Sequence, residues 1–182
     1  MKQTFSLIII LISCLVSFSQ DQKTAPPDPE TQSKMEAFAS GTGEIMKFTD
    51  TELSKLSLLY GVADTKVREI KRGGQTMYFY QISKADKYST HIASIAYEDL
   101  LEVIKAMEAL VEESAKDATS TKYIENKFVT DDGFQVGYFV SKGKLSWYLK
   151  LKRYGKNTLF LKNLESIQLS FNQAKNVIDQ MK

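Results

Sequence analysis

The chain has few of the residues that support metal, thiol or histidine chemistry. Its 182 residues include one cysteine, Cys14, and one histidine, His91. A zinc centre or a disulfide framework needs several such side chains, so we expect no metal, no cofactor and no structural disulfide. His91 lies in a probable strand beside two isoleucines, and we predict that it is structural or merely exposed. A domain without these cross-links must be stabilised by its hydrophobic core.

Proline is equally scarce. All three prolines lie in the polar stretch 20–34, which carries too little apolar surface to fold and is predicted to be a disordered, extended tether. The remainder, 35–182, contains none. The whole chain is 43% hydrophobic, 11% aromatic and 25% charged, which is ordinary for a globular protein. We predict a single domain over 35–182.

The first nineteen residues read as an export signal. Lys2 precedes an apolar run over 5–18, which is shorter than the ~20 residues of a membrane span. The small residues of Ser17-Phe18-Ser19 predict a secretory signal peptide, 1–19, cleaved after Ser19. We therefore expect a periplasmic or extracellular protein. The alternative is a lipoprotein anchored at Cys14, because Leu11-Ile12-Ser13-Cys14 fits a lipobox.

Apolar periodicity predicts two amphipathic helices and two groups of strands. Leucine, valine, isoleucine and methionine recur at spacings of three and four over 97–114, and a second such stripe runs from 170 to the C-terminus. Ser170 and Gln173 fit a capping box. Segments rich in aromatic and β-branched residues, separated by glycine turns, predict strands at 44–48, 66–71, 75–83, 90–95, 123–129, 134–140, 144–153 and 158–162. The segment 53–60 fits either a helix or a strand.

The two halves resemble each other. Residues 74–82 align with 143–151, and 95–107 align with 169–181 without a gap. This predicts an α+β fold of two antiparallel strand-rich units, about 41–118 and 119–182, each followed by one helix and related by a pseudo-twofold axis. In element order such units resemble the ββββα repeats of the Whirly and PUR folds. The leader, ending Ser-Phe-Ser-Gln, and the strand-helix repeat resemble those of exported Bacteroidota proteins, a resemblance that implies location and no activity.

Carboxylates are the remaining candidates for acid-base chemistry. Asp131 and Asp132 precede Gly133 between two strand-like runs, where Asp-Gly is typical of a tight turn. Glu98 and Asp99 begin a predicted helix, where negative charge interacts favourably with the helix dipole. These local roles explain all four residues, and we expect no enzyme. A carboxylate-based hydrolase with its site between the two repeats is the alternative.

A basic, aromatic strand is the most suggestive surface. Alternation over 144–152 predicts a core face and a solvent face, continued past the strand, that together present Lys144, Tyr148, Lys150, Lys152, Arg153 and Tyr154. The segment 121–182 has 11 basic and 5 acidic residues, whereas 35–120 has 10 basic and 14 acidic. The basic strand could meet an unknown protein, an anionic glycan, a lipid surface or a second copy in a homodimer, or its lysines could simply prevent aggregation.

These observations predict an exported, non-enzymatic binding module of unknown ligand. Basic strands with an exposed tyrosine can also bind single-stranded nucleic acid. The export signal argues against that partner, so a nucleic-acid binder is the least favoured reading.

Overall fold

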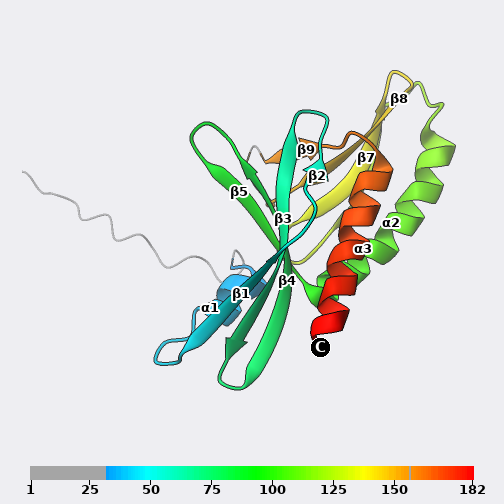
Figure 1. The fold of residues 1–182 in the computed structure, drawn as a ribbon. Helices are drawn as coiled ribbons and strands as arrows, with labels where there is room; N and C mark the ends of the chain where they lie inside the picture. Colours follow the sequence, from blue (N-terminus) through cyan, green and yellow to red (C-terminus); the bar gives the residue numbers. More distant parts are fainter. Residues whose placement is uncertain (1–31, 156) are drawn as a thin grey trace, which may run out of the picture.

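The computed structural model describes residues 32–155 and 157–182, so the predicted leader and nearly all of the predicted tether lie outside the described residues. The first unit comprises α1 (Lys34–Ala39), β1 (Met46–Glu52), β2 (Leu56–Ser57), β3 (Val62–Arg72), β4 (Gln75–Ala85), β5 (Thr90–Ala96) and α2 (Tyr97–Asp117). The second comprises β6 (Ile124–Val129), β7 (Gln135–Ser141), β8 (Lys144–Lys150), β9 (Thr158–Phe160) and α3 (Leu164–Met181). The predicted α+β class, with two strand-rich units each followed by a helix, is confirmed (Figure 1).

Each unit contributes one antiparallel sheet. The first sheet has the strand order β1-β3-β4-β5, with β2 also paired to β3, and the second has the order β6-β7-β8-β9. A bridge between Leu58 and Leu161 connects the two sheets, and the amide of Leu59 donates to the carbonyl of Phe160 at 2.8 Å. The ambiguous segment 53–60 therefore takes the extended alternative, because its backbone pairs with both sheets.

The two long helices close a core that both units share. They lie side by side and run in opposite directions, and Tyr97 at the start of α2 donates a hydrogen bond to Asp179 near the end of α3 (Figure 1). Their apolar stripes join one cluster with residues of both sheets, in which Tyr80, Leu100, Tyr138, Leu149, Phe171 and Ile178 are almost fully buried. Burial of this shared cluster supplies the main driving force for folding.

The other face of the first sheet carries a smaller cluster. Because side chains alternate along a strand, Val67 and Tyr80 face the shared core while Ile70 and Phe79 face away from it. Helix α1 packs on this second face through Met35 and Phe38. Lys34, assigned to the tether by its polarity, is the first residue of α1, with Ser33 as N-cap in a capping box.

The predicted start of the last helix was wrong. Helix α3 begins at Leu164, because the side chain of Asn163 accepts a hydrogen bond from the amide of Ser166 at 2.9 Å. Ser170 is therefore no cap: it is buried inside the helix, and its hydroxyl lies 2.6 Å from the hydroxyl of Tyr80. The pseudo-twofold relation between the units stays a prediction.

The Tyr80–Ser170 hydrogen bond yields a test that separates a buried pair from a helix cap. Tyr80→Phe and Ser170→Ala should each lower the free energy of unfolding by about 1 kcal/mol. Each substitution removes one hydroxyl of the pair and leaves the other buried without its partner. Urea denaturation of the two single variants and the double variant measures this. The double variant should cost clearly less than the two single costs added, and strict additivity would contradict the pairing.

Candidate functional site

The structure divides the predicted basic surface into two parts. Lys144 lies beside the β7–β8 turn, whereas Lys152, Arg153 and Tyr154 follow the opposite end of β8, which stops at Lys150 rather than at 153. Lys152, Arg153 and Tyr154 are exposed, and they line a large hollow. Only these three of the predicted surface residues meet at a concave site.

The prediction that Tyr148 is solvent-facing was wrong. The residue is only 6% exposed, and its hydroxyl donates a hydrogen bond to Glu125 at 2.5 Å. It lies on the face of the second sheet that is turned away from the shared core, as the alternation predicted, but that face has an aromatic cover: Phe139 packs on Tyr148, and the rings of Tyr123 and Phe160 pack on Phe139. Tyr148 is therefore not available to stack on a ligand.

The hollow beside Lys152, the large pocket, has a volume of about 490 Å³. Its floor is the second face of the first sheet, and its walls come from the N-terminus of α1, the β6–β7 turn and the segment after β8. The lining residues from these elements include Glu36, Lys66, Arg68, Gln81, Ile92, Ser94, Asp131, Asp132, Phe134, Leu151, Lys152 and Arg153. The pocket thus uses residues of both units, and a volume in this range suits a small ligand or a short piece of a larger one.

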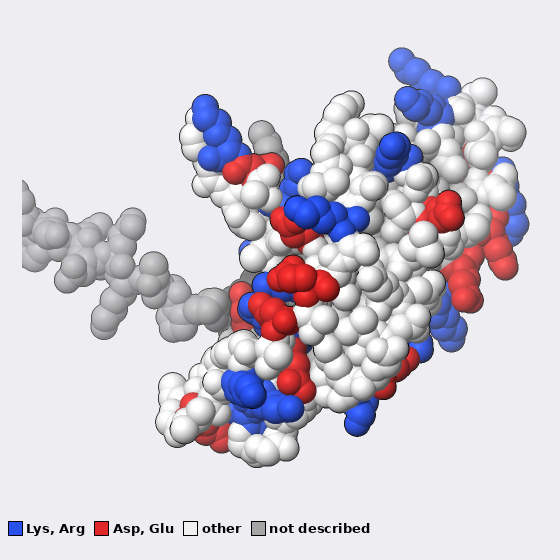
Figure 2. All heavy atoms as spheres, viewed as in Figure 1, with Lys and Arg blue, Asp and Glu red and all other residues white. Residues whose placement is uncertain are grey.

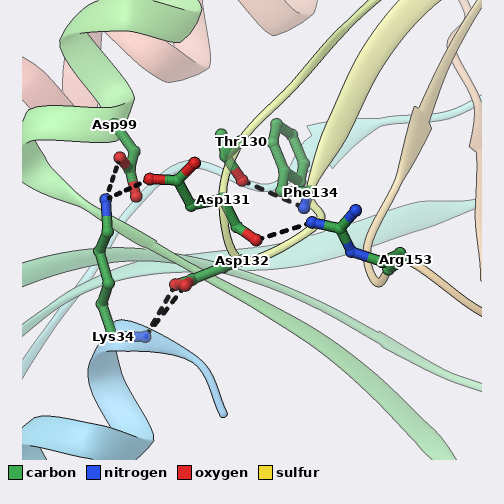
Figure 3. Close-up of polar contacts among 7 residues, drawn as sticks. All are labelled: Lys34, Asp99, Thr130, Asp131, Asp132, Phe134 and Arg153. Atoms are coloured by element: carbon green, nitrogen blue, oxygen red, sulfur yellow. Dashed lines mark hydrogen bonds and ion pairs between the residues drawn. The ribbon is translucent and has the colours of Figure 1, made fainter. Parts of the chain in front are cut away.

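The β6–β7 turn and the segment after β8 pack backbone against backbone. Thr130 exchanges main-chain hydrogen bonds with Phe134 and Gly133, which closes the turn. Gly133 has a φ of +83°, and a Cβ added there would lie 2.6 Å from Cβ of Arg153, so both the conformation and the space require glycine. The guanidinium of Arg153 also donates to the carbonyl of Asp131 at 2.9 Å, which fixes this wall of the pocket (Figure 3).

A single lysine joins three elements at the edge of the pocket. Nζ of Lys34 lies 2.5 Å from Oδ1 of Asp99 at the start of α2 and 3.7 Å from Oδ2 of Asp131 (Figure 3). The main-chain amide of Lys34 donates to both carboxylate oxygens of Asp132, at 3.0 and 3.1 Å. We call this set of four residues the Lys34 clamp. The turn prediction for Asp131 and Asp132 is right, but it missed that both also face a lysine almost a hundred residues away.

Burial and neighbouring charges act in opposite directions on the pKa of Lys34 and of Asp132. Burial alone would lower the pKa of Lys34, but the hydrogen bond and charge of Asp99 outweigh it and raise that pKa. Asp99 itself is almost fully buried, and its Oδ2 has no hydrogen-bond partner among the described residues. Burial raises the pKa of Asp132, and the neighbouring charges of Asp99 and Asp131 add to the rise, while Lys34 opposes it.

The acidic side chains of the pocket have donors in the protein. Asp131 and Asp132 contact Lys34, and Glu36 accepts hydrogen bonds from the amide and hydroxyl of Ser33 in the capping box of α1. Their negative charge is therefore partly compensated before any ligand arrives.

The basic side chains of the pocket are less well compensated. Lys66 and Arg68 share the carboxylate of Asp50: Nζ of Lys66 lies 2.8 Å from Oδ2, and Nε of Arg68 lies 2.7 Å from Oδ1. The hydrogen bond from Arg68 lowers the pKa of Asp50 to about 2. Within the part of the chain that the structure describes, Lys152 and Arg153 form no ion pair with a carboxylate. Figure 2 shows charges of both signs interspersed over the face in view.

His91 does not form a catalytic triad. Both the hydroxyl of Ser89 and the carboxylate of Asp86 lie 3.3 Å from the same ring nitrogen, Nε2, whereas a relay needs one partner on each nitrogen.

Over residues 32–155 and 157–182, no three His, Cys, Asp or Glu side chains are grouped to hold a metal ion. No helix in those ranges is long and apolar enough to span a bilayer.

Replacing Lys34 tests the cost of leaving Asp99 without its cation. Lys34→Met should lower the free energy of unfolding by about 2 kcal/mol, because it leaves a buried carboxylate without the one ion-pair partner that it has among the described residues. Adding Asp99→Asn should restore most of that loss, and a thermodynamic cycle from chemical denaturation measures it. Independent, additive costs would show that the two residues do not depend on each other.

The raised pKa of Asp132 predicts a pH dependence with a definite sign. When the pKa of a carboxyl is higher in the folded than in the unfolded state, the group contributes stability at low pH. That contribution is lost as the pH rises through the pKa of the folded state. The variant Asp132→Asn retains an oxygen acceptor and cannot ionise. Its stability relative to the original chain should therefore increase as the pH rises from acid to neutral, as measured by urea denaturation. A relative decrease over that interval would mean that ionised Asp132 is favoured in the fold.

In comparisons with known proteins, no protein-family model, curated protein or solved structure matches the chain. The resemblances to exported Bacteroidota proteins and to the Whirly and PUR repeats therefore rest on the sequence features alone. The function has to be argued from the geometry and charge of the large pocket.

Proposed function

We propose that the protein is an exported, non-enzymatic binding module whose site is the large pocket, and that the pocket takes an acidic ligand or an acidic part of a partner. The observation that carries this proposal is the imbalance of charge within the pocket. Its carboxylates have donors in the protein, whereas Lys152 and Arg153 lack a carboxylate partner among the described residues. A group with negative charge is the ligand chemistry that such cations favour.

Export remains part of the proposal and is supported by the leader sequence. Outside the cytoplasm, acidic groups are found on proteins, on glycans that contain uronic acids and on membrane lipids, and nucleic acid is not an ordinary partner there. The exposed apolar side chain of Ile92 also lines the pocket. It would contact the uncharged part of a ligand, as in most binding pockets, where a few polar groups fix the orientation.

A carboxylate-based hydrolase is the second candidate, and one observation favours it. Asp132 lines a concave site between the two units, and burial raises its pKa, which is a property of catalytic acids. Against it, both oxygens of Asp132 already accept hydrogen bonds from the amide of Lys34. If a substrate were found, Asp132→Asn should abolish turnover under the hydrolase reading and leave binding intact under the binding reading.

Paired substitutions at the pocket test the proposed site. Poly-glutamate, alginate and phosphatidylglycerol vesicles are suitable probes, because each presents negative charge on a different kind of scaffold. Replacing Lys152 and Arg153 together by alanine should weaken the probe that binds by about tenfold or more, since about 1.4 kcal/mol of lost interaction corresponds to that factor. Titration at low and at physiological salt measures this.

The control variant replaces Lys144 and Lys162, which are exposed and lie outside the pocket, by alanine. It removes the same charge, so it should retain binding within about twofold if the pocket is the site. Equal losses in both variants would indicate attraction to net charge alone and would contradict the proposal. Binding of none of the three probes would contradict it as well.

A further inference from the structure

The first sheet has an unpaired edge at the large pocket. Strand β5 pairs with β4 on one side, from Phe79 opposite Ala96 to Ala85 opposite Thr90, and it is the last strand in the sheet order (Figure 1). Across residues 32–155 and 157–182, no main-chain hydrogen bond joins the other side of β5 to another segment. Such an edge presents a row of free N–H and C=O groups to anything that can supply a complementary row.

This edge contributes main-chain atoms to the large pocket. Ile92, Ala93 and Ser94 all line it, but the methyl group of Ala93 belongs to the shared core on the opposite face of the sheet and is buried. The part of Ala93 that faces the pocket is therefore its backbone. A pocket bordered by strand backbone fits an extended polypeptide better than it fits a sugar ring or a lipid headgroup, because only a polypeptide matches the spacing of the strand's hydrogen-bonding groups.

We infer, building on the proposed function, that the acidic ligand is an extended segment of another protein, which adds to β5 as a further strand and places an acidic side chain against Lys152 and Arg153. Side chains of the added strand would alternate between the pocket and solvent. Those in the pocket would meet the exposed apolar side chain of Ile92 as well as the two cations. The predicted ligand is a segment in which apolar and acidic residues alternate.

A second copy of this chain does not fit the same edge as well. Pairing of two β5 strands would bring together the sequence Thr90-His91-Ile92-Ala93-Ser94-Ile95-Ala96, which contains no acidic residue. Such a dimer would leave Lys152 and Arg153 without the carboxylate that the geometry favours. The charge of the pocket therefore selects an acidic segment from a different chain over self-association through β5.

A display library of random seven-residue peptides, panned against the chain from residue 20 onward, tests this inference. We expect selected peptides with alternating apolar and acidic residues, resynthesised for anisotropy titration. N-methylation of alternate amides removes main-chain donors while keeping every side chain, and it should weaken binding by about tenfold or more. Replacement of the acidic residue by lysine should do the same.

Three protein variants locate the peptide. Lys152→Ala alone keeps the contact of Arg153 with Asp131, and it should weaken binding without altering the circular dichroism spectrum. The double Lys152 and Arg153 variant should weaken binding further, and the Lys144 and Lys162 control should not. In an NMR titration, the amide signals of 90–96 should shift more than those of the distant edge strand β1.

The outcomes separate the two proposals. Selection of no peptide, or binding that N-methylation leaves unchanged, overturns strand addition, while alginate, vesicle or poly-glutamate binding that depends on Lys152 and Arg153 would still support the acidic-ligand site. Binding of neither peptides nor acidic probes overturns both proposals. If the chain instead forms a dimer through β5, and the dimer no longer binds the selected peptides, a second copy occupies the edge. That result would overturn the choice of partner.

Discussion

The contact of Lys34 with three aspartates is the constraint on which the pocket depends. Its ammonium group holds Asp99 at the start of α2, and its main-chain amide holds Asp132 in the β6–β7 turn. One residue thus connects α1 to the helix of the first unit and to a turn of the second. Replacing its side chain would leave a nearly buried carboxylate unpaired.

The same contact sets the charge that the pocket offers to a ligand. Because Lys34 and the capping box already supply donors to these carboxylates, the negative charge of the acidic wall is partly compensated from inside the protein. The cations on the other elements are not matched in this way: Asp50 serves both Lys66 and Arg68, and Lys152 is exposed beside them in the pocket lining. The preference for an acidic ligand therefore follows from which charged groups already have partners in the protein, more than from the net charge of the chain.

Local pattern in the sequence predicted much of the fold and little of the site. The stripe that begins at Tyr97 places α2 within a few residues of its end, since amphipathic periodicity is a property of neighbouring residues. Tyr148 was misread because alternation tells which side chains share a face and not whether that face is covered, here by Phe139. The last helix was predicted to begin at Ser170 because Ser170 and Gln173 fit a capping box, whereas the observed cap is Asn163. The pairing of Lys34 with Asp99 spans 65 residues and leaves no local signal.

The most direct test of this account follows the Lys34 clamp itself in an NMR pH titration of the chain from residue 20 onward. The carboxyl carbon of Asp132 and the amide proton of Lys34 should titrate together, with one shared midpoint above the ordinary aspartate pKa of 3.8, because the amide donates to that carboxylate. If the two signals titrate independently, the clamp does not exist in the form described and the charge assignment of the pocket fails with it; a shared midpoint below the ordinary value would show that Lys34 outweighs the burial of Asp132.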